Sequence, residues 1–234
     1  VRWHVAARSL VACGVQAGTA FALARLHAGF ACALRVGTSP PVPVARARGL
    51  WQGFGSSPLI YNCVVSMAIQ EHAGHCQEKG LGFSLAEPSG DSGNLKVQGV
   101  VWADDHLSVA STPADLATMM ADLQTRLSER GLHLALEDSS KCVVIRNRFA
   151  MPEPVVVNGV ALHDATEARF LGAMYNLEDV GQSLFQDRLA KGRRLFMARR
   201  PAFCSRGMPL LRRWKAVCMQ VLPCVLWAIQ TVWL

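Results

Sequence analysis

The clearest pattern of hydrophobic and polar positions lies between Thr112 and Gly131. Apolar residues recur there at steps of three and four, the spacing of one face of an α-helix. They are Leu116, Met120, Leu123 and Leu127. Thr112 is a favourable N-cap, Pro113 suits the first turn, and Gly131 suits the end. The pattern predicts an amphipathic helix over 113–130 with its apolar stripe in the core.

Other stretches are expected to be helical on shorter patterns. An apolar run over 59–72 follows Ser56-Ser57-Pro58, where a serine is available as N-cap and a proline lies near the first helical position. Further helices are expected at 2–13, at 19–28 and from about 179 onward, where the pattern becomes both helical and basic.

Extended segments are predicted from apolar runs and turn residues. Asn158-Gly159 separates two valine-containing runs and favours a type I′ hairpin, because both residues readily take a positive φ. Prolines exclude a helix over 38–44. Further extended segments are predicted at 33–37, 38–44, 132–136, 142–145 and 169–172, and a polar loop is expected over 78–93.

Two adjacent carboxylates, Asp104 and Asp105, lie between the apolar run Val100-Val101-Trp102 and Leu107. Such an arrangement places acidic groups at the tip of a tight hairpin. Turn chemistry alone explains the pair, because short polar side chains satisfy turn backbone and tolerate unusual dihedral angles. The alternative is a metal-binding site, and only the surrounding sequence separates the two interpretations.

The charge of the chain is uneven. The 234 residues are 51% hydrophobic, which excludes a disordered protein, and the formal net charge is +7. No acidic residue follows Asp187, whereas basic residues are dense there. They are Arg188, Lys191, Arg193, Arg194, Arg199, Arg200, Arg206, Arg212, Arg213 and Lys215. This distribution suggests an anionic partner such as nucleic acid, and a solvated helix face is the alternative interpretation.

Eight cysteines are scattered without CxxC pairs, so no zinc site is indicated. The N-terminal region shows no secretory signal, and reduced, mostly buried thiols fit best. We therefore expect an intracellular protein, in the nucleus or the cytoplasm. The chain begins at Val1 and stops inside an apolar run, so both ends look like cuts through a longer protein.

The final run, Val217 to Leu234, contains no charged residue and reaches the lower length limit for a membrane-spanning helix. Gln220, Pro223 and Gln230 oppose that interpretation. We expect a core or subunit-packing helix instead of a membrane span.

Taken in order, several segments resemble the reverse transcriptase domain of non-LTR retrotransposons and, less closely, that of group II intron proteins. The segment from Arg48 to Asn62 is similar to the family's RGVRQGxxLSPLLFN. The other matching segments are Trp102-Ala103-Asp104-Asp105, Gly131-Leu132-His133-Leu134, Lys141, Phe170-Leu171-Gly172 and Leu222-Pro223-Cys224-Val225-Leu226. A lone xADD motif is weak, but this order of motifs covers nearly the whole chain.

The resemblance implies an α/β fold built as a polymerase palm, with an antiparallel sheet, packed helices and partial fingers. Residues 1–178 would form the partial fingers and palm, and 179–234 a truncated helical thumb. The implied function is RNA-directed DNA synthesis with an RNA template, a DNA primer and dNTPs. No membrane partner is expected.

The resemblance also implies roles for individual residues. Asp104 and Asp105 would be catalytic and hold Mg²⁺, or alternatively Mn²⁺, because hard cations prefer carboxylate oxygens. Gln52 and Gly53 would lie against the incoming nucleotide and template. Lys141 would either neutralise the leaving phosphate or solvate a strand end. The last set is the primer grip, formed by Phe170, Leu171 and Gly172.

Departures from the family pattern lead to a second hypothesis. Trp102 replaces a Phe or Tyr, Trp51 stands where Arg is frequent, and Phe54-Gly55-Ser56 replaces a segment that commonly carries Asp-Pro-Leu. The family's first catalytic aspartate would align upstream of Val1. We therefore expect this piece alone not to polymerise. The alternative is an inactive retrotransposon remnant that only binds nucleic acid.

Overall fold

The computed structural model describes residues 1–29, 32–35, 37–44, 49–50, 53–85, 95–205 and 207–226. Its contacts divide the chain into two units. The first comprises Val1–Cys142 and Glu153–Ala161, and the second comprises Val143–Pro152 and Leu162–Leu234.

The helices of the first unit confirm the predicted pattern and extend it. They are α1 (Trp3–Ala12), α2 (Ala17–Gly29), α3 (Ser57–Glu78) and α4 (Pro113–Glu129). Thr112 caps α4 as predicted, because its hydroxyl accepts a hydrogen bond from the Asp115 amide at 3.1 Å. Ser56 precedes α3 but does not cap it with its side chain. Its hydroxyl instead lies 2.9 Å from His27 Nε2.

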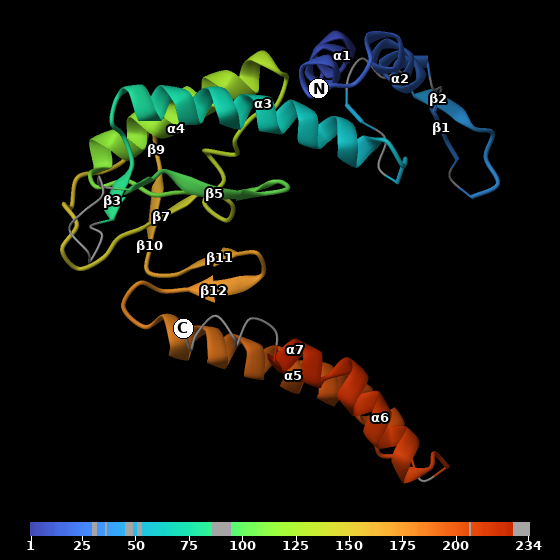
Figure 1. Ribbon diagram of the computed structural model, residues 1–234. Coiled ribbons are helices and arrows are strands. Elements are labelled where there is room, and N and C mark those ends of the chain that lie inside the picture. The colour runs from blue at the N-terminus through green and yellow to red at the C-terminus, as the bar shows by residue number, and fades with distance from the viewer. Residues whose placement is uncertain are drawn as a thin grey trace. The chain divides into compact units, whose positions relative to one another are not determined.

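Helix α3 is the centre of the first unit, because α1 and α4 both pack against it, and α2 packs on α1 (Figure 1). Its N-terminal half contributes Ile60, Cys63 and Val64 to a cluster with residues of α1 and α2. Its C-terminal half packs on α4, where Ala68 meets Leu123 and Leu127. Because α3 has neighbours along its whole length, it continues to Glu78, beyond the predicted end at 72.

The described strands pair two by two. In the first unit the pairs are β1 (Cys32–Leu34) with β2 (Val42–Val44), β3 (Phe83–Leu85) with β4 (Leu95–Val97), β5 (Gly99–Trp102) with β6 (Asp105–Ser108), and β8 (Val156–Val157) with β9 (Val160–Ala161). All four pairs are antiparallel. The Asn-Gly hairpin is confirmed, with φ of 49° at Asn158 and 84° at Gly159.

Two sequence predictions in this unit are wrong. Residues 132–136 form no strand, because the Leu132 amide bonds to Leu127 O and the Leu134 amide to Gln124 Oε1. Those amides complete the end of α4 and are not available to a ladder. The predicted loop over 78–93 contains strand β3, while residues 86–94 lie outside the described residues.

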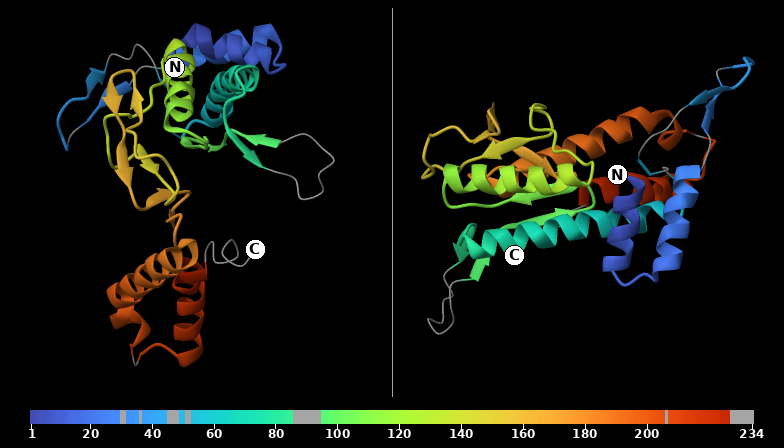
Figure 2. Two further views of the ribbon diagram at one scale, coloured as in Figure 1. Left: turned by 90° about the vertical axis from the view of Figure 1, so that its left-hand side faces the viewer. Right: turned by 90° about the horizontal axis from the view of Figure 1, so that it is seen from above.

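The second unit combines short strands with basic helices. Strand β7 (Val143–Ile145) pairs in parallel with β10 (His163–Ala165), and β11 (Ala168–Phe170) pairs antiparallel with β12 (Ala173–Tyr175). The helices are α5 (Val180–Phe203), α6 (Leu210–Gln220) and α7 (Leu222–Leu226). Figure 2 shows α6 returning along α5. A Cβ added at Gly192 on α5 would collide with Val225 on α7, so the glycine allows this close approach.

Among the described residues no helix has both the length and the apolar character needed to cross a membrane. The run from Val217 is divided between α6 and α7, and 227–234 lie outside the described part. The described cysteines whose side chains are placed are free thiols, but only Cys63 and Cys76 are buried. The prediction of mostly buried thiols is therefore wrong.

The mixture of helices and small strand pairs agrees with the predicted α/β class. The assignment of fingers, palm and thumb, and the boundary at 178/179, stay predictions.

Candidate functional site

The aspartate pair lies at the tip of the β5–β6 hairpin, as the apolar runs on either side of it predict. Strand positions Trp102 and Asp105 face each other in the ladder, so the loop consists of Ala103 and Asp104. Ala103 has a φ of 53°. A positive φ at the first loop position matches the twist of the flanking strands and closes a two-residue hairpin.

Both carboxylates are accessible to solvent. Asp104 and Asp105 are exposed, and within the described residues neither forms an ion pair. Trp102 is 67% exposed, so its side chain does not belong to the core. Carboxylates that are not neutralised by a nearby Lys or Arg are available to a cation, and hard oxygen donors suit Mg²⁺.

A cavity of about 150 Å³ lies between this hairpin and helices α3 and α4. Asp104 and His106 line it from the hairpin, Tyr61 from α3 and Leu123 from α4. The pKa of the Tyr61 phenol is raised, first by burial and then by the negative charge of Asp104. Tyr61 is therefore a neighbour of the aspartate that sequence reasoning did not single out.

His106 pairs with Val101, one position from the tip of the hairpin. Its Nε2 lies 2.7 Å from Ser108 Oγ, and its ring meets that of His72 on α3 edge-on, with centroids 6.5 Å apart. Burial, followed by the neighbouring His72, lowers the pKa of His106 to about 4. The imidazole is neutral near pH 7, so it adds no positive charge beside the aspartates.

A polar network joins α3 to α4 on the side of His72. His72 Nδ1 lies 2.8 Å from Asp122 Oδ2, and Arg126 Nε lies 3.4 Å from Asp122 Oδ1. Arg130 Nη2 donates to Glu71 Oε1 at 2.6 Å. A signal for this network exists in the sequence, because Asp122, Arg126 and Arg130 recur every four residues on one side of α4.

The other predicted nucleotide-binding residues are only partly placed. Gly53 has a φ of +82° in the turn before α3, and no atom of the described residues lies within 4 Å of the position that a Cβ would take. Gln52 lies outside the described residues. Lys141 is exposed, and its Nζ lies 3.5 Å from Asp138 Oδ2.

The predicted primer grip belongs to the second unit. Phe170 ends β11, while Leu171 and Gly172 form the loop to β12. The predicted strand over 169–172 is therefore shorter, since its last two residues are turn. Phe170 packs on Tyr175 of β12, with ring centroids 6.5 Å apart.

The donor set at the aspartate hairpin suits a magnesium ion but is small. No group of three or more His, Cys, Asp or Glu residues able to hold a metal is present among the described residues. Magnesium is commonly held by one or two carboxylates together with substrate phosphates and water, so two aspartates fit part of such a site.

Comparison with known proteins agrees with the resemblance of the motifs. Residues 1–175 match the model of the family described as reverse transcriptase (RNA-dependent DNA polymerase). Over 139 residues the chain is 29% identical to the retrovirus-related Pol polyprotein from type-1 retrotransposable element R2 of Nasonia vitripennis. The aligned region is 56% of this chain and 12% of that protein. The chain therefore belongs to the reverse transcriptase family, of the non-LTR retrotransposon type.

Proposed function

We propose that the chain forms part of an RNA-directed DNA polymerase that extends a DNA primer on an RNA template. The observation that carries the proposal is the β5–β6 hairpin. It presents Asp104 and Asp105 side by side, exposed and without an ion pair within the described residues, in a chain that belongs to the reverse transcriptase family.

In this proposal Asp104 and Asp105 hold Mg²⁺, with Mn²⁺ as the alternative. A bound divalent ion would stabilise the negative charge that develops during nucleotidyl transfer. Asp104 is the principal ligand, and Asp105 supports a second ion or the primer terminus. The neutral His106 and its contact with His72 keep the hairpin, near its tip, fixed against α3.

Residues outside the hairpin bind the substrates. Gln52 and Gly53 contact the incoming dNTP and template, and the positive φ of Gly53 with open space around it supports close backbone approach. Lys141 neutralises phosphate charge, for which its 3.5 Å pair with Asp138 must open. Phe170, Leu171 and Gly172 contact the primer strand.

The described residues supply too few carboxylates for a two-metal site. We propose that a further carboxylate comes from elsewhere in the polymerase, so that the 234-residue chain alone does not synthesise DNA. The test compares this chain with a longer one that includes the upstream coding sequence, in a primer-extension assay on an RNA template with Mg²⁺.

We expect synthesis from the longer chain only, and its loss by a factor of about 100 or more in Asp104→Asn, since a charged metal ligand is removed. Glu137→Gln is the matched control, because it removes an exposed carboxylate of the same unit outside the hairpin. Activity in the 234-residue chain would disprove the dependence on an added carboxylate, and full activity in Asp104→Asn would disprove the metal-ligand role.

The second candidate is a catalytically inactive remnant that only binds nucleic acid. The small donor set at the hairpin favours it. The same assay separates the candidates, because a remnant in its longer form binds an RNA–DNA duplex without extending the primer.

A further inference from the structure

The loop between β11 and β12 has an unusual backbone for its sequence. Leu171 has a φ of 50° and Gly172 a φ of 75°, so both loop residues are left-handed. Two successive left-handed residues form the turn that suits a two-residue hairpin, and glycine, asparagine and aspartate favour it. Leucine does not, because its Cβ approaches the following carbonyl oxygen in this region.

A second hairpin of the chain shows what the same geometry requires when the sequence suits it. Asn158 and Gly159 take φ values of 49° and 84° between β8 and β9. Within the described residues no side chain donates to the Gly159 carbonyl. The Asn-Gly turn therefore forms without side-chain support, as its residue preferences predict.

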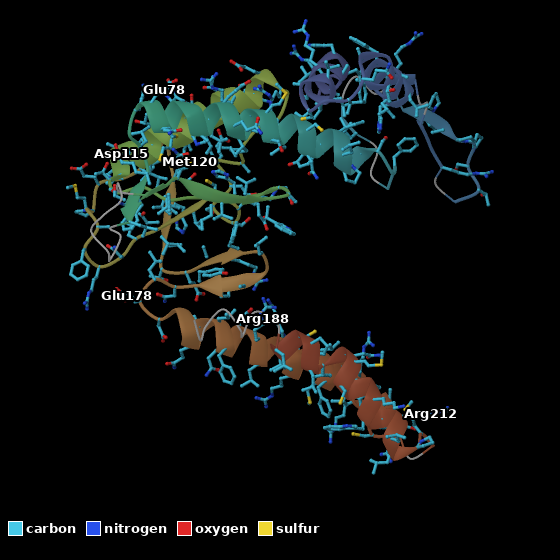
Figure 3. The ribbon with its side chains drawn as sticks, in the orientation of Figure 1. Glu78, Asp115, Met120, Glu178, Arg188 and Arg212 are labelled. Atoms are coloured by element: carbon cyan, nitrogen blue, oxygen red, sulfur yellow. The ribbon has the colours of Figure 1, made fainter. Side chains whose placement is uncertain are left out.

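The Leu171-Gly172 turn has such support. The Gly172 carbonyl accepts a hydrogen bond from Arg188 Nη2 and another from Lys191 Nζ, the latter at 3.3 Å. Both cations belong to α5 and are three residues apart, so they lie on one face of that helix. Arg188 is only 7% exposed, and Figure 3 labels it on the side of α5 that faces this hairpin.

Asp187 forms ion pairs with Lys191 and with Arg169. Its Oδ2 lies 2.8 Å from Lys191 Nζ, and its Oδ1 lies 3.3 Å from Arg169 Nη2 on β11. The carboxylate thereby fixes Lys191 and joins the strand directly to α5. Hydrogen bonds between charged groups are among the stronger ones in proteins, and several of them hold one geometry better than one.

The cations of α5 therefore fall into two groups. In the first group Arg188 and Lys191 are directed to the hairpin, and Arg199 donates to Gln220 of α6. The second group is exposed and has no side-chain contact within the described residues; its members are Arg193, Arg194 and Arg200. Only the second group is available to a phosphate backbone without loss of an internal contact.

We infer that Arg188 and Lys191 are positioning residues, which hold the Leu171-Gly172 turn in its left-handed conformation and so set the geometry of the primer grip. The inference rests on the proposed function of this turn. Helix α5 then supports the turn. The cations on this face of α5 bind the Gly172 carbonyl and not a nucleic-acid phosphate.

The structural half is tested in the full 234-residue chain by NMR, with the backbone chemical shifts of Leu171 and Gly172 as the readout of a left-handed turn. We expect Arg188→Met to move these shifts toward the values of extended backbone, and Lys191→Met to move them in the same direction by a smaller amount. Arg193→Met should leave the shifts unchanged. Adding Leu171→Asn to either variant should restore the turn, because asparagine adopts this conformation unaided. Unchanged shifts in both single variants would overturn the inference.

The functional half is tested by the affinity of the same chains for an RNA–DNA duplex with a recessed primer 3′ end and for a blunt duplex. The wild type should prefer the recessed end. Arg188→Met should reduce that preference by about tenfold, the effect of one charge-assisted hydrogen bond. Arg193→Met should lower the affinity for both duplexes by the same factor.

The outcomes separate the inference from the function on which it rests. If the wild type shows no preference, the proposed primer role of the turn fails, and only the NMR result remains for the positioning role. If the wild type prefers the recessed end and Arg188→Met keeps that preference with a loosened turn, the positioning role is overturned.

Discussion

At the scale of single residues, the unfavourable backbone positions lie at hairpin loops. The described residues other than glycine with a positive φ are Ala103, Asn158 and Leu171, and each opens a two-residue loop. Asparagine tolerates this conformation, whereas alanine and leucine do not favour it. Two of these loops are the proposed metal-binding and primer-grip loops. Strained backbone is commonly kept where function requires a fixed geometry.

We expect Ala103→Gly to raise the free energy of unfolding by about 0.5–1 kcal/mol, because glycine has no Cβ to oppose a positive φ and this gain exceeds its extra entropy when unfolded. Asn158→Ala is the converse control and should lower it by about 1 kcal/mol. Urea unfolding followed by circular dichroism measures both. A less stable Ala103→Gly protein would show that the loop does not strain the alanine.

The thiols differ in reactivity for a physical reason. Burial, assisted by Cys13 for Cys63 and by Asp122 for Cys76, raises the pKa of both thiols to about 11. Each thiolate is therefore rarer in the folded than in the unfolded chain. The folded state binds more protons above pH 9, so this contribution to stability is present below about pH 9 and is lost as the pH rises toward 11.

We expect iodoacetamide at pH 8 to modify exposed Cys204 in the native protein and to leave Cys63 and Cys76 unmodified, because the thiolate is the reactive form. Peptide mass spectrometry measures the extent of labelling. In urea all three should react alike. Equal labelling of Cys76 and Cys204 in the native protein would contradict the burial of Cys76.

At the scale of elements, the sequence correctly predicts the helices and hairpins whose caps and turn residues lie close together in the chain. Helix α4 begins and ends where Thr112 and Gly131 indicate, and the Asn158-Gly159 hairpin forms as expected. The aspartate hairpin follows from the apolar runs around it. These elements are specified by caps, turn residues and periodicity within a few positions of the chain.

A local sequence pattern does not predict an element whose bounds depend on contacts with residues far away in the sequence. Helix α3 continues to Glu78 because Cys76 packs with Leu81 and Met119, and no local signal shows that contact. Residues 132–136 have strand-like composition, but the Leu132 and Leu134 amides donate hydrogen bonds to residues of α4 and not to a neighbouring strand. Tyr61 and Asp104 are 43 positions apart, and His72 and His106 are 34 positions apart, so the sequence locates the aspartates but not the residues that surround them.

The cap of α4 gives a prediction at this scale. Thr112→Ala removes the acceptor of the Asp115 amide and should lower the free energy of unfolding by about 1 kcal/mol. Thr118→Ala is the matched control, because its hydroxyl bonds Ala114 O within the helix and alanine has the higher helix propensity. Urea unfolding should show a loss in the first variant only. An equal loss in both would mean that side-chain packing, not the cap, determines the effect.

At the scale of the whole chain, the basic residues are concentrated towards the C-terminus. No acidic residue follows Asp187, and none of the described residues of α6 is buried. Arg193, Arg194 and Arg212 are exposed, whereas Arg188 and Lys191 serve the hairpin. The exposed cations therefore form the part of the C-terminal charge that a nucleic acid can neutralise.

This division predicts how binding depends on salt. Each phosphate contact releases counterions, so the slope of log K against log salt becomes steeper with each contact. The double variant Arg193→Gln/Arg194→Gln should make the slope for an RNA–DNA duplex shallower by about 2, if each arginine contacts one phosphate. Arg2→Gln/Arg8→Gln changes the net charge equally through exposed residues of the first unit, and should leave the slope nearly unchanged. Fluorescence anisotropy titrations at several salt concentrations measure both. Equal changes in the two variants would mean that net charge, and not the exposed face of α5, governs binding.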